Sequence, residues 1–361
     1  MRIVYDGHIF RWQKAGGISR YFNEIISRLP VDWQPLMLGT EARNGNFPVH
    51  PRLEVSPLCS FRPRRFSQPF KKTWWKLRYI QNARVFHPTF YNLTGGLRFS
   101  EIPCPVVVTV HDFIKARYPQ VEGDSTEAVA HQREAILHAA HVVCVSKATE
   151  QDLLEFHPQA AGKTSVIYHG SSFSVCHEPQ PEEIFETPTF LYVGRRATYK
   201  NFSMVLRAFA KACASHPGIR LRIAGPPLDD EERWHIHFLG ISDRVDSSVF
   251  PDEHSLQQLY RKSVALLYPS RHEGFGIPPL EAMACGTLVI TSNATSLPEV
   301  VGDAGIILDP ADENAWAECI LQVAAQRIRR KELIEKGKAR AAVLTWERSA
   351  TRHVEIYKQF S

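Results

Sequence analysis

Short runs of aliphatic and β-branched residues alternate along this chain with longer segments of helical periodicity. Residues 106–110 are almost wholly apolar, as in a strand buried on both faces of a parallel sheet. The expected strands span residues 2–5, 106–110, 142–145, 164–168, 190–193, 221–224, 264–268, 287–290 and 305–308. In residues 16–29, apolar side chains recur on one face of a helix. Strands that alternate with helices form parallel sheets with helices on both faces, so the sequence predicts an α/β protein.

A break in this pattern divides the chain into two blocks. Residues 171–188, SSFSVCHEPQPEEIFETP, are rich in Ser, Pro and Glu and are typical of a linker. The 361 residues suffice for two domains of about 150 residues each. We therefore expect two Rossmann-like, parallel-sheet domains that face a central cleft, at residues 1–170 and 189–344, and a C-terminal helix within 345–361. Such sheets bind ligands at the carboxyl ends of their strands, which is where functional residues are expected.

Composition excludes several classes of protein. Apolar residues make up 44% of the chain and the net charge is +5, so intrinsic disorder is excluded as its main state. No run approaches the ~18 apolar residues of a membrane-spanning helix, and MRIVYDGHIF lacks the apolar segment of a signal peptide. The seven cysteines are scattered singly without a C-x-x-C pair, which indicates neither disulfides nor a zinc site. We expect a reduced, cytoplasmic protein.

The segment 270–286, SRHEGFGIPPLEAMACG, follows an expected strand and carries the densest group of candidate residues. Gly274 and Gly276 let the backbone approach a ligand, and two prolines followed by Gly286 fit the first turn and the end of a short helix. Amides at such a helix start attract a diphosphate. Phosphate repels carboxylates, so Glu273 and Glu281 are expected to accept hydrogen bonds from hydroxyl groups of a sugar and a ribose. The alternative is that both glutamates are merely solvated.

Several cations follow the first expected strand of the second block, in residues 194–201 (GRRATYKN). Arg195 and Lys200 lie where two positive charges can hold a diphosphate. Each such contact at about 4 Å is worth ~4 kcal/mol at an effective dielectric constant of about 20. The alternative is a solvated loop with three cations.

Two weaker signals lie in the first block. Gly16 and Gly17 precede the first expected helix, where their amides can contact phosphate, although the spacing is not the G-x-G-x-x-G of dinucleotide-binding proteins. His111 and Asp112 follow the strand at 106–110, so the imidazole can touch a substrate hydroxyl there. A plain helix-start loop and a structural histidine are the alternatives.

Together these segments resemble glycosyltransferase family 4, whose members are retaining enzymes of the GT-B fold that use nucleotide sugars. The resemblance is carried by Glu273 with Glu281, Arg195 with Lys200, Gly16 with Gly17, and His111 with Asp112. VIYHG at 166–170 is similar to the end of the first domain in this family, although His169 stands where Asn is common. The chain is also similar to bacterial enzymes that build surface polysaccharides, many of them mannosyltransferases.

The resemblance implies how a nucleotide-sugar donor binds. The implied donor-binding residues are Gly16, Gly17, Arg195, Lys200, Phe250, Glu273, Gly274, Phe275, Gly276, Ile277 and Glu281. Arg195 and Lys200 would bind the diphosphate, and Glu281 would hold the ribose hydroxyls. Glu273 would hold hydroxyls of the donor sugar. Phe250, which follows a strand-like stretch, would border the base.

The resemblance also implies retention of the anomeric configuration, by front-face attack without a protein nucleophile. His111 would lie near the anomeric carbon and Glu273 would position the sugar, while Arg195 and Lys200 would stabilise the charge on the leaving diphosphate. No D-x-D or H-E-x-x-H occurs in the chain, so no metal and no other cofactor is expected. The first domain would bind the acceptor and the second the nucleotide sugar, and the C-terminal helix would cross back onto the first domain.

A basic, aromatic stretch occupies residues 61–84, which contain eight Arg or Lys and no acidic residue. This composition suits an anionic membrane surface or a lipid-linked diphosphate acceptor. A solvated face with buried aromatics and a nucleic-acid site are the alternatives, although no nucleic-acid-binding motif accompanies the stretch. We therefore expect contact with the acceptor or peripheral contact with the inner membrane surface, and no nucleic-acid partner.

The sequence thus predicts a hexosyltransferase, with mannose from GDP-mannose as the best single choice of donor by resemblance alone. The acceptor would be a saccharide or lipid-linked saccharide in the synthesis of a cell-surface polysaccharide such as lipopolysaccharide. A UDP-glucose or UDP-galactose donor and a non-catalytic sugar-nucleotide-binding protein stay open, as does the oligomeric state. A nicotinamide-dependent oxidoreductase is disfavoured, because the chain lacks the G-x-G-x-x-G fingerprint and the acidic residue about 20 positions later.

Overall fold

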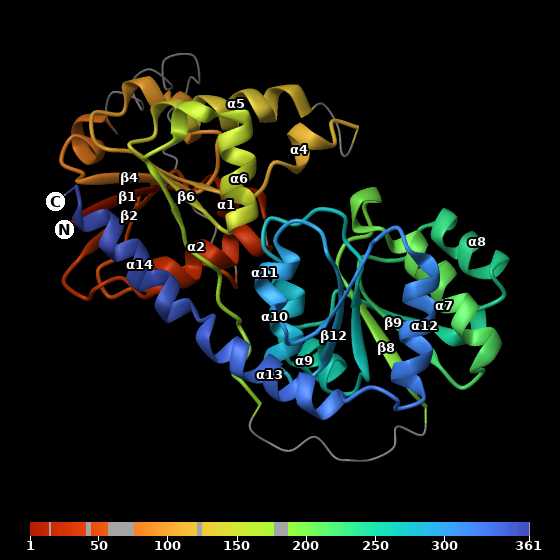
Figure 1. Ribbon diagram of the computed structural model, residues 1–361. Helices are drawn as coiled ribbons and strands as arrows, with labels where there is room; N and C mark the ends of the chain where they lie inside the picture. Colours follow the sequence, from red (N-terminus) through yellow and green to blue (C-terminus); the bar gives the residue numbers. More distant parts are fainter. Residues whose placement is uncertain (14–15, 41–44, 57–75, 121–124, 177–186, 361) are drawn as a thin grey trace. The chain divides into compact units, whose positions relative to one another are not determined.

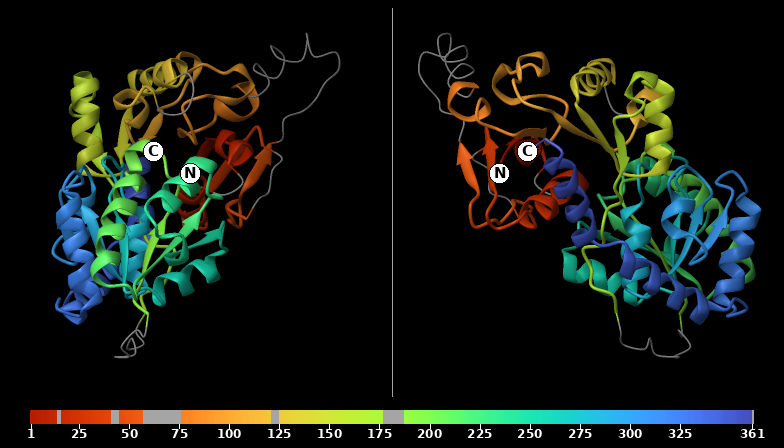
Figure 2. Two further views of the ribbon diagram at one scale, coloured as in Figure 1. Left: turned by 90° about the vertical axis from the view of Figure 1, so that its right-hand side faces the viewer. Right: turned by 60° about the vertical axis from the view of Figure 1, so that its left-hand side comes forward.

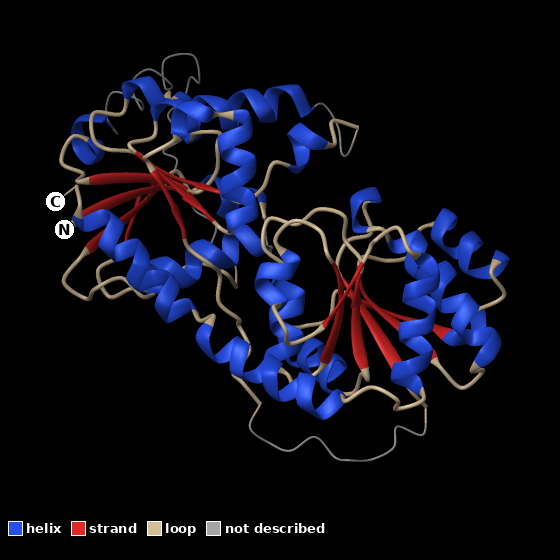
Figure 3. Cartoon of the chain, viewed as in Figure 1, coloured by secondary structure: helices blue, strands red, loops and turns tan. Residues whose placement is uncertain are grey.

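The computed structural model describes residues 1–13, 16–40, 45–56, 76–120, 125–176 and 187–360. The chain divides into two compact units. The first contains Met1–His169 and Trp346–Ser361, and the second contains Gly170–Thr345. In each unit, helices flank a parallel β-sheet (Figures 1 and 3), which confirms the expected α/β class. Residues 177–186 of the expected linker lie outside the described residues.

The sheet of the first unit consists of two groups of parallel strands. The first group, in the order β3-β2-β1-β4, contains β1 (Arg2–Asp6), β2 (Gln34–Leu38), β3 (Glu54–Ser56) and β4 (Val85–Pro88). The second group, in the order β5-β6-β7, contains β5 (Val107–Val110), β6 (His141–Cys144) and β7 (Thr164–Val166). A parallel bridge between Phe86 and Val106 joins β4 to the second group.

Among the described residues, the α-helices of the first unit are α1 (His8–Trp12), α2 (Gly17–Ser27), α4 (Ile114–Arg117), α5 (Ser125–His138), α6 (Lys147–Phe156) and α14 (Trp346–Lys358). Short 3-10 or π turns lie at η1 (Lys76–Ile80), η2 (Thr94–Gly96), η3 (Phe99–Glu101) and η4 (Pro158–Ala160). The expected first helix is α2, which buries Tyr21, Phe22, Ile25 and Ile26 along one face. The sequence predicted that the glycine pair Gly16 and Gly17 lies between the first strand and the first helix. This placement is wrong, because a short helix, α1, lies between β1 and the glycine pair.

The second unit contains a sheet of six parallel strands in the order β10-β9-β8-β11-β12-β13. These strands are β8 (Thr189–Val193), β9 (Arg220–Gly225), β10 (Val245–Val249), β11 (Ala265–Tyr268), β12 (Leu288–Ser292) and β13 (Ile306–Leu308). Its helices are η5 (Thr198–Lys200), α7 (Phe202–Ser215), α8 (Asp230–Phe238), η6 (Ser242–Arg244), α9 (Glu253–Arg261), α10 (Ile277–Ala284), α11 (Leu297–Val301), α12 (Glu313–Ala324) and α13 (Arg330–Val343). Figure 2 shows both units from two further sides.

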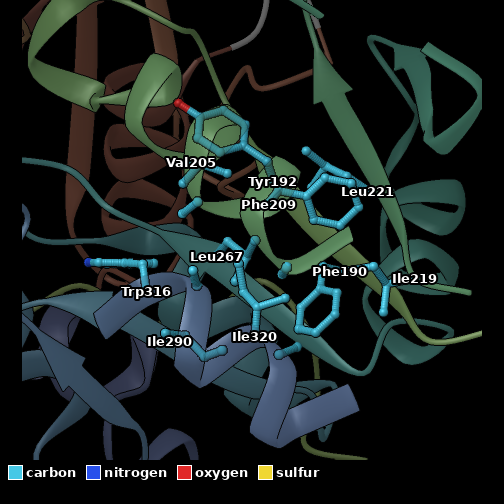
Figure 4. Close-up of a cluster of buried hydrophobic side chains, with 14 of the residues drawn as sticks. Phe190, Tyr192, Val205, Phe209, Ile219, Leu221, Leu267, Ile290, Trp316 and Ile320 are labelled. Atoms are coloured by element: carbon cyan, nitrogen blue, oxygen red, sulfur yellow. The ribbon is translucent and has the colours of Figure 1, made fainter. Parts of the chain in front are cut away.

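Large apolar side chains from the strands and helices of the second unit form one of its buried cores. Phe190 and Tyr192 of β8 pack with Phe209 of α7 and with Trp316 and Ile320 of α12 (Figure 4), and each is at most 1% exposed. Because β8 lies inside the sheet, its residues are apolar almost throughout. This apolar run allowed the strand to be predicted from the sequence.

Three strands escaped prediction, and a fourth, β10, was expected only as a strand-like stretch before Phe250. The composition of each of the four makes it hard to recognise. β2 (QPLML) and β4 (VFHP) contain proline, and β3 spans only three residues. β10 (VDSSV) is polar because it lies at the edge of its sheet, where one side of the strand has no neighbour. Periodicity alone cannot separate such segments from loops.

Buried tyrosines and histidines attach α14 to the sheet of the first unit. On α14, His353 Nε2 lies 2.6 Å from the Tyr21 hydroxyl, and the Tyr357 hydroxyl lies 2.6 Å from His87 Nδ1. Thr109 Oγ1 connects the two ends, at 2.8 Å from the Tyr21 hydroxyl and 2.9 Å from His87 Nε2. All five side chains are buried. Helices α2 and α14 and strands β4 and β5 therefore share one continuous chain of hydrogen bonds.

One assignment of donors and acceptors satisfies every hydrogen bond in this series while both of its histidines are neutral. His353 Nδ1 lies 2.7 Å from the Ser349 carbonyl oxygen, which can only accept, so Nδ1 carries the proton and Nε2 accepts from Tyr21. The Tyr21 oxygen then accepts from Thr109, whose oxygen accepts from the Nε2 proton of His87. Every donor in this half of the chain therefore points in one direction.

The same order continues at the other end of the chain. Since His87 carries its proton on Nε2, its Nδ1 accepts from Tyr357, and the Tyr357 oxygen accepts from the Tyr5 hydroxyl at 3.3 Å. Burial lowers the pKa of His353 to about 4, and burial with the nearby His353 lowers the pKa of His87 well below its usual range. Neutral histidines are thus a condition of this packing.

We predict that the first unit loses stability as the pH falls from about 6.5 to about 4, the interval between the unfolded and folded pKa values of His353. In this pH interval His353 binds a proton in the unfolded chain but stays neutral in the folded protein. The stabilisation that is present above about pH 6.5 is therefore lost on acidification. Each such histidine contributes a slope of up to ~1.4 kcal/mol per pH unit.

Urea unfolding at a series of pH values measures this slope. His353→Gln removes one titrating group and should flatten the slope, whereas His138→Gln, at an exposed position on α5, should leave it unchanged. Identical slopes for the wild type and His353→Gln would contradict the assignment of this histidine.

Candidate functional site

The order of strands in the second sheet reverses between β8 and β11. β9 and β10 extend the sheet from β8 on one side, and β12 and β13 extend it from β11 on the other. Parallel α/β sheets bind ligands at the carboxyl ends of the strands that flank such a reversal. Residues 194–201 follow β8 and residues 270–286 follow β11. The two segments that stand out most in the sequence therefore meet at the edge where this sheet is expected to bind a ligand.

Lys200 and Glu273 form an ion pair at this edge. Lys200 Nζ lies 2.6 Å from Glu273 Oε1, and only 15% and 9% of the two side chains are exposed. Nζ also lies 3.4 Å from the Tyr268 hydroxyl, and burial with the charge of Glu273 keeps the pKa of Tyr268 well above its usual range. From the sequence, the lysine and the glutamate are expected to bind different parts of a ligand, whereas in the structure they contact each other.

Side chains that follow β12 hold the loop that carries Glu273. The Glu273 amide donates to Thr295 Oγ1 at 2.9 Å, and the Ser296 hydroxyl lies 2.9 Å from the Glu273 carbonyl oxygen and 2.8 Å from that of Phe275. Thr295 has a φ of 47°, a conformation that is strained for a β-branched residue. No motif marks Thr295 and Ser296 in the sequence, so their role emerges only from the fold. They fix the backbone on which Glu273 stands.

The predicted turn and helix of residues 270–286 are present. Gly276 has a φ of 109°, and a Cβ there would lie 2.8 Å from a methyl carbon of Leu297, so the position requires glycine. α10 begins at Ile277 with Pro278 in its first turn, and Gly286, with a φ of 75°, follows its end. Gly274 and Phe275 are buried in the turn. The first amides of a helix lack partners within it, so the start of α10 is suited to an anion.

Glu281 lies in α10 and is 4% exposed. Its Oε2 accepts a hydrogen bond from the Tyr260 hydroxyl at 3.1 Å, and Tyr260 is itself buried in α9. Glu273 is 8% exposed. The alternative in which both glutamates are solvated is therefore wrong. A buried carboxylate requires hydrogen-bond partners, which Lys200 supplies to Glu273 and Tyr260 supplies to Glu281.

The two adjacent arginines after β8 differ in their surroundings. Arg195 is exposed, and its carbonyl oxygen accepts from the Tyr192 hydroxyl at 3.2 Å. The Arg196 side chain is 4% exposed, and its Nε lies 2.5 Å from Glu232 Oε1. Arg196 also donates to the carbonyl oxygens of Pro226 and Pro227. Arg196 thus attaches this loop to the turn after β9, a structural role that the sequence did not distinguish from that of Arg195.

Phe250 stands at the carboxyl end of β10. Its side chain is 70% exposed and its φ is 43°, while its amide donates to the Gly225 carbonyl oxygen at 2.9 Å. An exposed aromatic ring on a strained backbone is unusual, and such strain persists where the surrounding structure enforces it. The ring is therefore available to a flat ligand group.

The remaining candidates belong to the first unit. Gly17 begins α2, and Gly16 precedes it with a φ of 179°, an extended conformation that any residue adopts. His111 follows β5, and its ring is nearly parallel to that of His169, with 6.1 Å between centroids. Asp112 Oδ1 accepts from the Ile114 amide at 3.0 Å, which starts α4. Asp112 therefore has a local structural role.

Other predictions from the sequence concern metals and membranes. Within the described ranges, no three His, Cys, Asp or Glu side chains are grouped as metal ligands. Over the same part of the chain, no helix combines the length and the apolar character needed to cross a bilayer. Residues 61–75 of the basic stretch lie outside the described residues. In the rest of the stretch, the guanidinium carbon of Arg78 lies 5.8 Å from the centroid of the Tyr79 ring.

Models of two families match most of the chain. Residues 15–172 match the model described as Glycosyltransferase Family 4, and residues 177–340 match that of Glycosyl transferases group 1. The first match ends close to the end of the first unit's sheet, and the second contains every candidate residue of the second unit.

Relatives and a solved structure agree with these matches. O-antigen chain mannosyltransferase B of Escherichia coli is 46% identical over 175 residues, which span 46% of this chain and only 45% of that protein. D-inositol 3-phosphate glycosyltransferase of Streptosporangium roseum is 26% identical over 385 residues, spanning 95% of this chain and 88% of that protein. The crystal structure of Anabaena Alr3699/HepE in complex with UDP and glucose is similar with a TM-score of 0.75 at 16% identity, and the match covers 99% of each chain.

The order of the two matched domains, the two parallel sheets and the likeness over the whole chain lead to one assignment. The fold is GT-B, as the resemblance in the sequence implied. The chain belongs to the family 4 glycosyltransferases.

Proposed function

We propose that this protein is a retaining hexosyltransferase that moves a sugar from a nucleoside diphosphate to a saccharide or lipid-linked saccharide acceptor. The observation that carries the proposal is the ion pair of Lys200 and Glu273 beside the strand-order reversal of the second sheet, with the buried Glu281 in the helix that follows Glu273. A partly buried cation and two buried carboxylates at a ligand-binding edge suit a molecule that combines phosphates with hydroxyl groups.

The cations and the helix start are proposed to bind the donor diphosphate. Lys200 and Arg195 supply positive charge, and the first amides of α10 supply aligned dipoles. Gly16 and Gly17 of the first unit are proposed to add backbone amides. These groups stabilise the negative charge that grows on the leaving oxygen, and loss of one such donor costs about 10²–10³ in rate. No metal or other cofactor is part of the proposal, because the cations can take that role.

In the ion pair, the Glu273 carboxylate competes with the diphosphate for Lys200. A diphosphate that binds Lys200 draws its ammonium group away from Glu273, since both are anions. The released carboxylate then accepts hydrogen bonds from hydroxyls of the donor sugar. Binding of the phosphate end thereby prepares the sugar end.

The other parts of the donor have separate binding groups in this proposal. Glu281, whose carboxylate Tyr260 holds in place, binds the ribose hydroxyls, and Phe250 borders the base. His111 lies near the anomeric carbon. An acceptor hydroxyl attacks this carbon on the face that the diphosphate leaves, and its proton passes to the leaving phosphate oxygen. One glycosidic bond breaks and another forms with the same configuration.

Mannose from GDP-mannose is the proposed donor. Its support is the Escherichia coli relative, which is named as a mannosyltransferase and is 46% identical over less than half of either chain. UDP-glucose or UDP-galactose is the second candidate, because the Anabaena structure of the same fold holds UDP and glucose. The acceptor is proposed to belong to a cell-surface polysaccharide.

A panel of GDP-mannose, UDP-glucose, UDP-galactose and ADP-glucose tests the function. We expect GDP-mannose to be turned over fastest, with nucleotide release measured enzymatically and the anomer of the product determined by NMR. An α-linked product from the α-linked donor is the expected result. A β-linked product would refute retention, and calorimetric binding without turnover of any donor would indicate a non-catalytic sugar-nucleotide-binding protein.

Substitutions in the ion pair test the proposed roles of its two members. Lys200→Ala should weaken binding of the nucleoside diphosphate about 10- to 100-fold, since a hydrogen bond to a charged group contributes about 1.5–3 kcal/mol. Glu273→Gln should tighten that binding, because Lys200 loses its competitor, and should reduce turnover of the sugar nucleotide.

Isothermal titration with GDP and steady-state rates measure these two effects. Lys211→Ala is the matched control, because Lys211 lies on α7 and forms a half-exposed pair with Glu313. It should leave GDP binding and turnover unchanged. If Glu273→Gln weakened GDP binding as strongly as Lys200→Ala, the competition between carboxylate and diphosphate would be refuted.

We also propose that residues 61–84 bring the enzyme to the cytoplasmic surface of the inner membrane or to the diphosphate of a lipid-linked acceptor. The support is their composition of eight basic and no acidic residues. Replacing Arg64, Arg65, Lys71 and Lys72 with Ser should weaken sedimentation with phosphatidylglycerol vesicles about a hundredfold or more, at ~1 kcal/mol per basic residue. Phosphatidylcholine vesicles are the control, and unchanged binding to anionic vesicles would refute the membrane proposal.

A further inference from the structure

A stacked pair of imidazoles lies at the carboxyl edge of the first sheet. The ring of His111, which follows β5, is nearly parallel to the ring of His169, with 13° between the planes. The Tyr21 ring stands roughly perpendicular to both, at 5.1 Å from each centroid, with angles of 90° and 79°. His169 is 4% exposed and Tyr21 is fully buried. Two side chains thus fix the ring of His111 from two directions.

The Tyr21 ring is itself held in place by the chain of hydrogen bonds that attaches α14. Its hydroxyl donates to His353 and accepts from Thr109, at 2.6 and 2.8 Å. Trp346, at the start of α14, contacts the His169 ring edge to face, with 5.3 Å between centroids. The surface against which His111 packs is therefore rigid and is anchored in α2 and α14.

The surroundings of His111 disfavour a charge on its ring. Its Nε2 is buried and has no hydrogen-bond partner among the described residues. The groups that face the ring are Tyr21 and Phe22 of α2 and the neutral His169, with the neutral His87 of β4 nearby. Asp112, its neighbour in the chain, directs one oxygen to the Ile114 amide. Burial lowers the pKa of His111 to about 3.

We propose that His169 and Tyr21 are positioning residues, which hold the imidazole of His111 in one orientation and in its neutral form for sugar transfer. The inference rests on the proposed function in that His111 is taken to act beside the anomeric carbon. There a neutral imidazole can exchange hydrogen bonds with hydroxyls without repelling the positive charge that develops on the sugar. A protonated ring would oppose that charge and slow the transfer.

Substitutions at position 169 separate packing from charge. His169→Phe keeps a flat ring beside His111, His169→Ala removes it, and His169→Asp places a carboxylate beside it. Misplacement of a reacting group by about 1 Å costs up to about 10²-fold in rate. We therefore expect kcat to fall about tenfold or more in His169→Ala, with the donor KM little changed, and to be largely restored in His169→Phe.

The protonation state has a readout that does not require activity. Histidine ring NMR signals are recorded between about pH 5 and about pH 8, where an ordinary histidine titrates. The signal of His111 is assigned from its loss in His111→Gln. We expect no titration of His111 in the wild type and a clear titration in His169→Asp, with a new inflection in its pH–rate profile. His138→Gln is the control, and it should change neither kcat nor the His111 signal.

Tyr21→Phe tests whether the hydrogen bonds of the Tyr21 hydroxyl position His111. It also provides a second test if the variants at position 169 fail to fold. It retains the ring but removes the hydroxyl that Thr109 and His353 hold, so kcat should fall while the donor KM and the folded spectrum are retained. The rates are measured with GDP-mannose, or with the panel donor that replaces it.

The outcomes separate this inference from the proposed function. Titration of His111 within the recorded range in the folded wild type would overturn the inference, as would equal losses of kcat in folded His169→Phe and His169→Ala. If the wild type turned over no donor of the panel, the proposed function would fail and the role in transfer with it. The NMR result would still decide whether His169 and Tyr21 keep His111 neutral.

Discussion

The reversal of strand order between β8 and β11 is the constraint on which the candidate site depends. Connections between parallel strands are right-handed. From β8 the chain continues to β9 on one side, and from β11 it continues to β12 on the other, so the connecting helices lie on opposite faces of the sheet. α7 accordingly packs with α12, and α10 packs with α13. In such folds, ligands bind outside the carboxyl ends of the two strands, between the loops that leave them. Residues far apart in the chain, such as Lys200 and Glu273, can therefore meet there.

The Lys200–Glu273 ion pair is largely removed from water, which sets its energetics. Removing two charges from water costs several kcal/mol per ion, and their mutual attraction offsets this only with good geometry. In the proposed function, a diphosphate replaces the carboxylate as the partner of the lysine, so one ion pair is exchanged for another and no charge is exposed. The loop of Glu273 is fixed by Thr295 and Ser296, which limits the reorganisation that this exchange requires.

The first unit buries the polar rings of several tyrosines and histidines, which need hydrogen-bond partners. Its tyrosines and histidines satisfy one another along a chain with a single proton order, from Tyr5 to the carbonyl oxygen of Ser349. A buried polar network is stable only when each member has a partner, and this one connects α14 to the sheet. His111 lies beside the network but outside its hydrogen bonds. In the proposed function, its ring is the part of this packed group that faces the sugar.

The sequence by itself determined the α/β class and the glycine turn and helix of residues 270–286. These features are local: a buried strand is apolar along its length, and a left-handed turn demands glycine at Gly276 whatever surrounds it. The proline-containing strands β2 and β4 were missed, because they lack that local pattern.

Only the tertiary structure decided which charged and aromatic groups touch. It paired Lys200 with Glu273, assigned Arg196 and not Arg195 to Glu232, and packed Tyr21 and His169 around His111. These contacting residues are separated by dozens of positions in the chain. Their proximity follows from strand order and helix packing, and the spacing of residues in a single sequence carries no record of either.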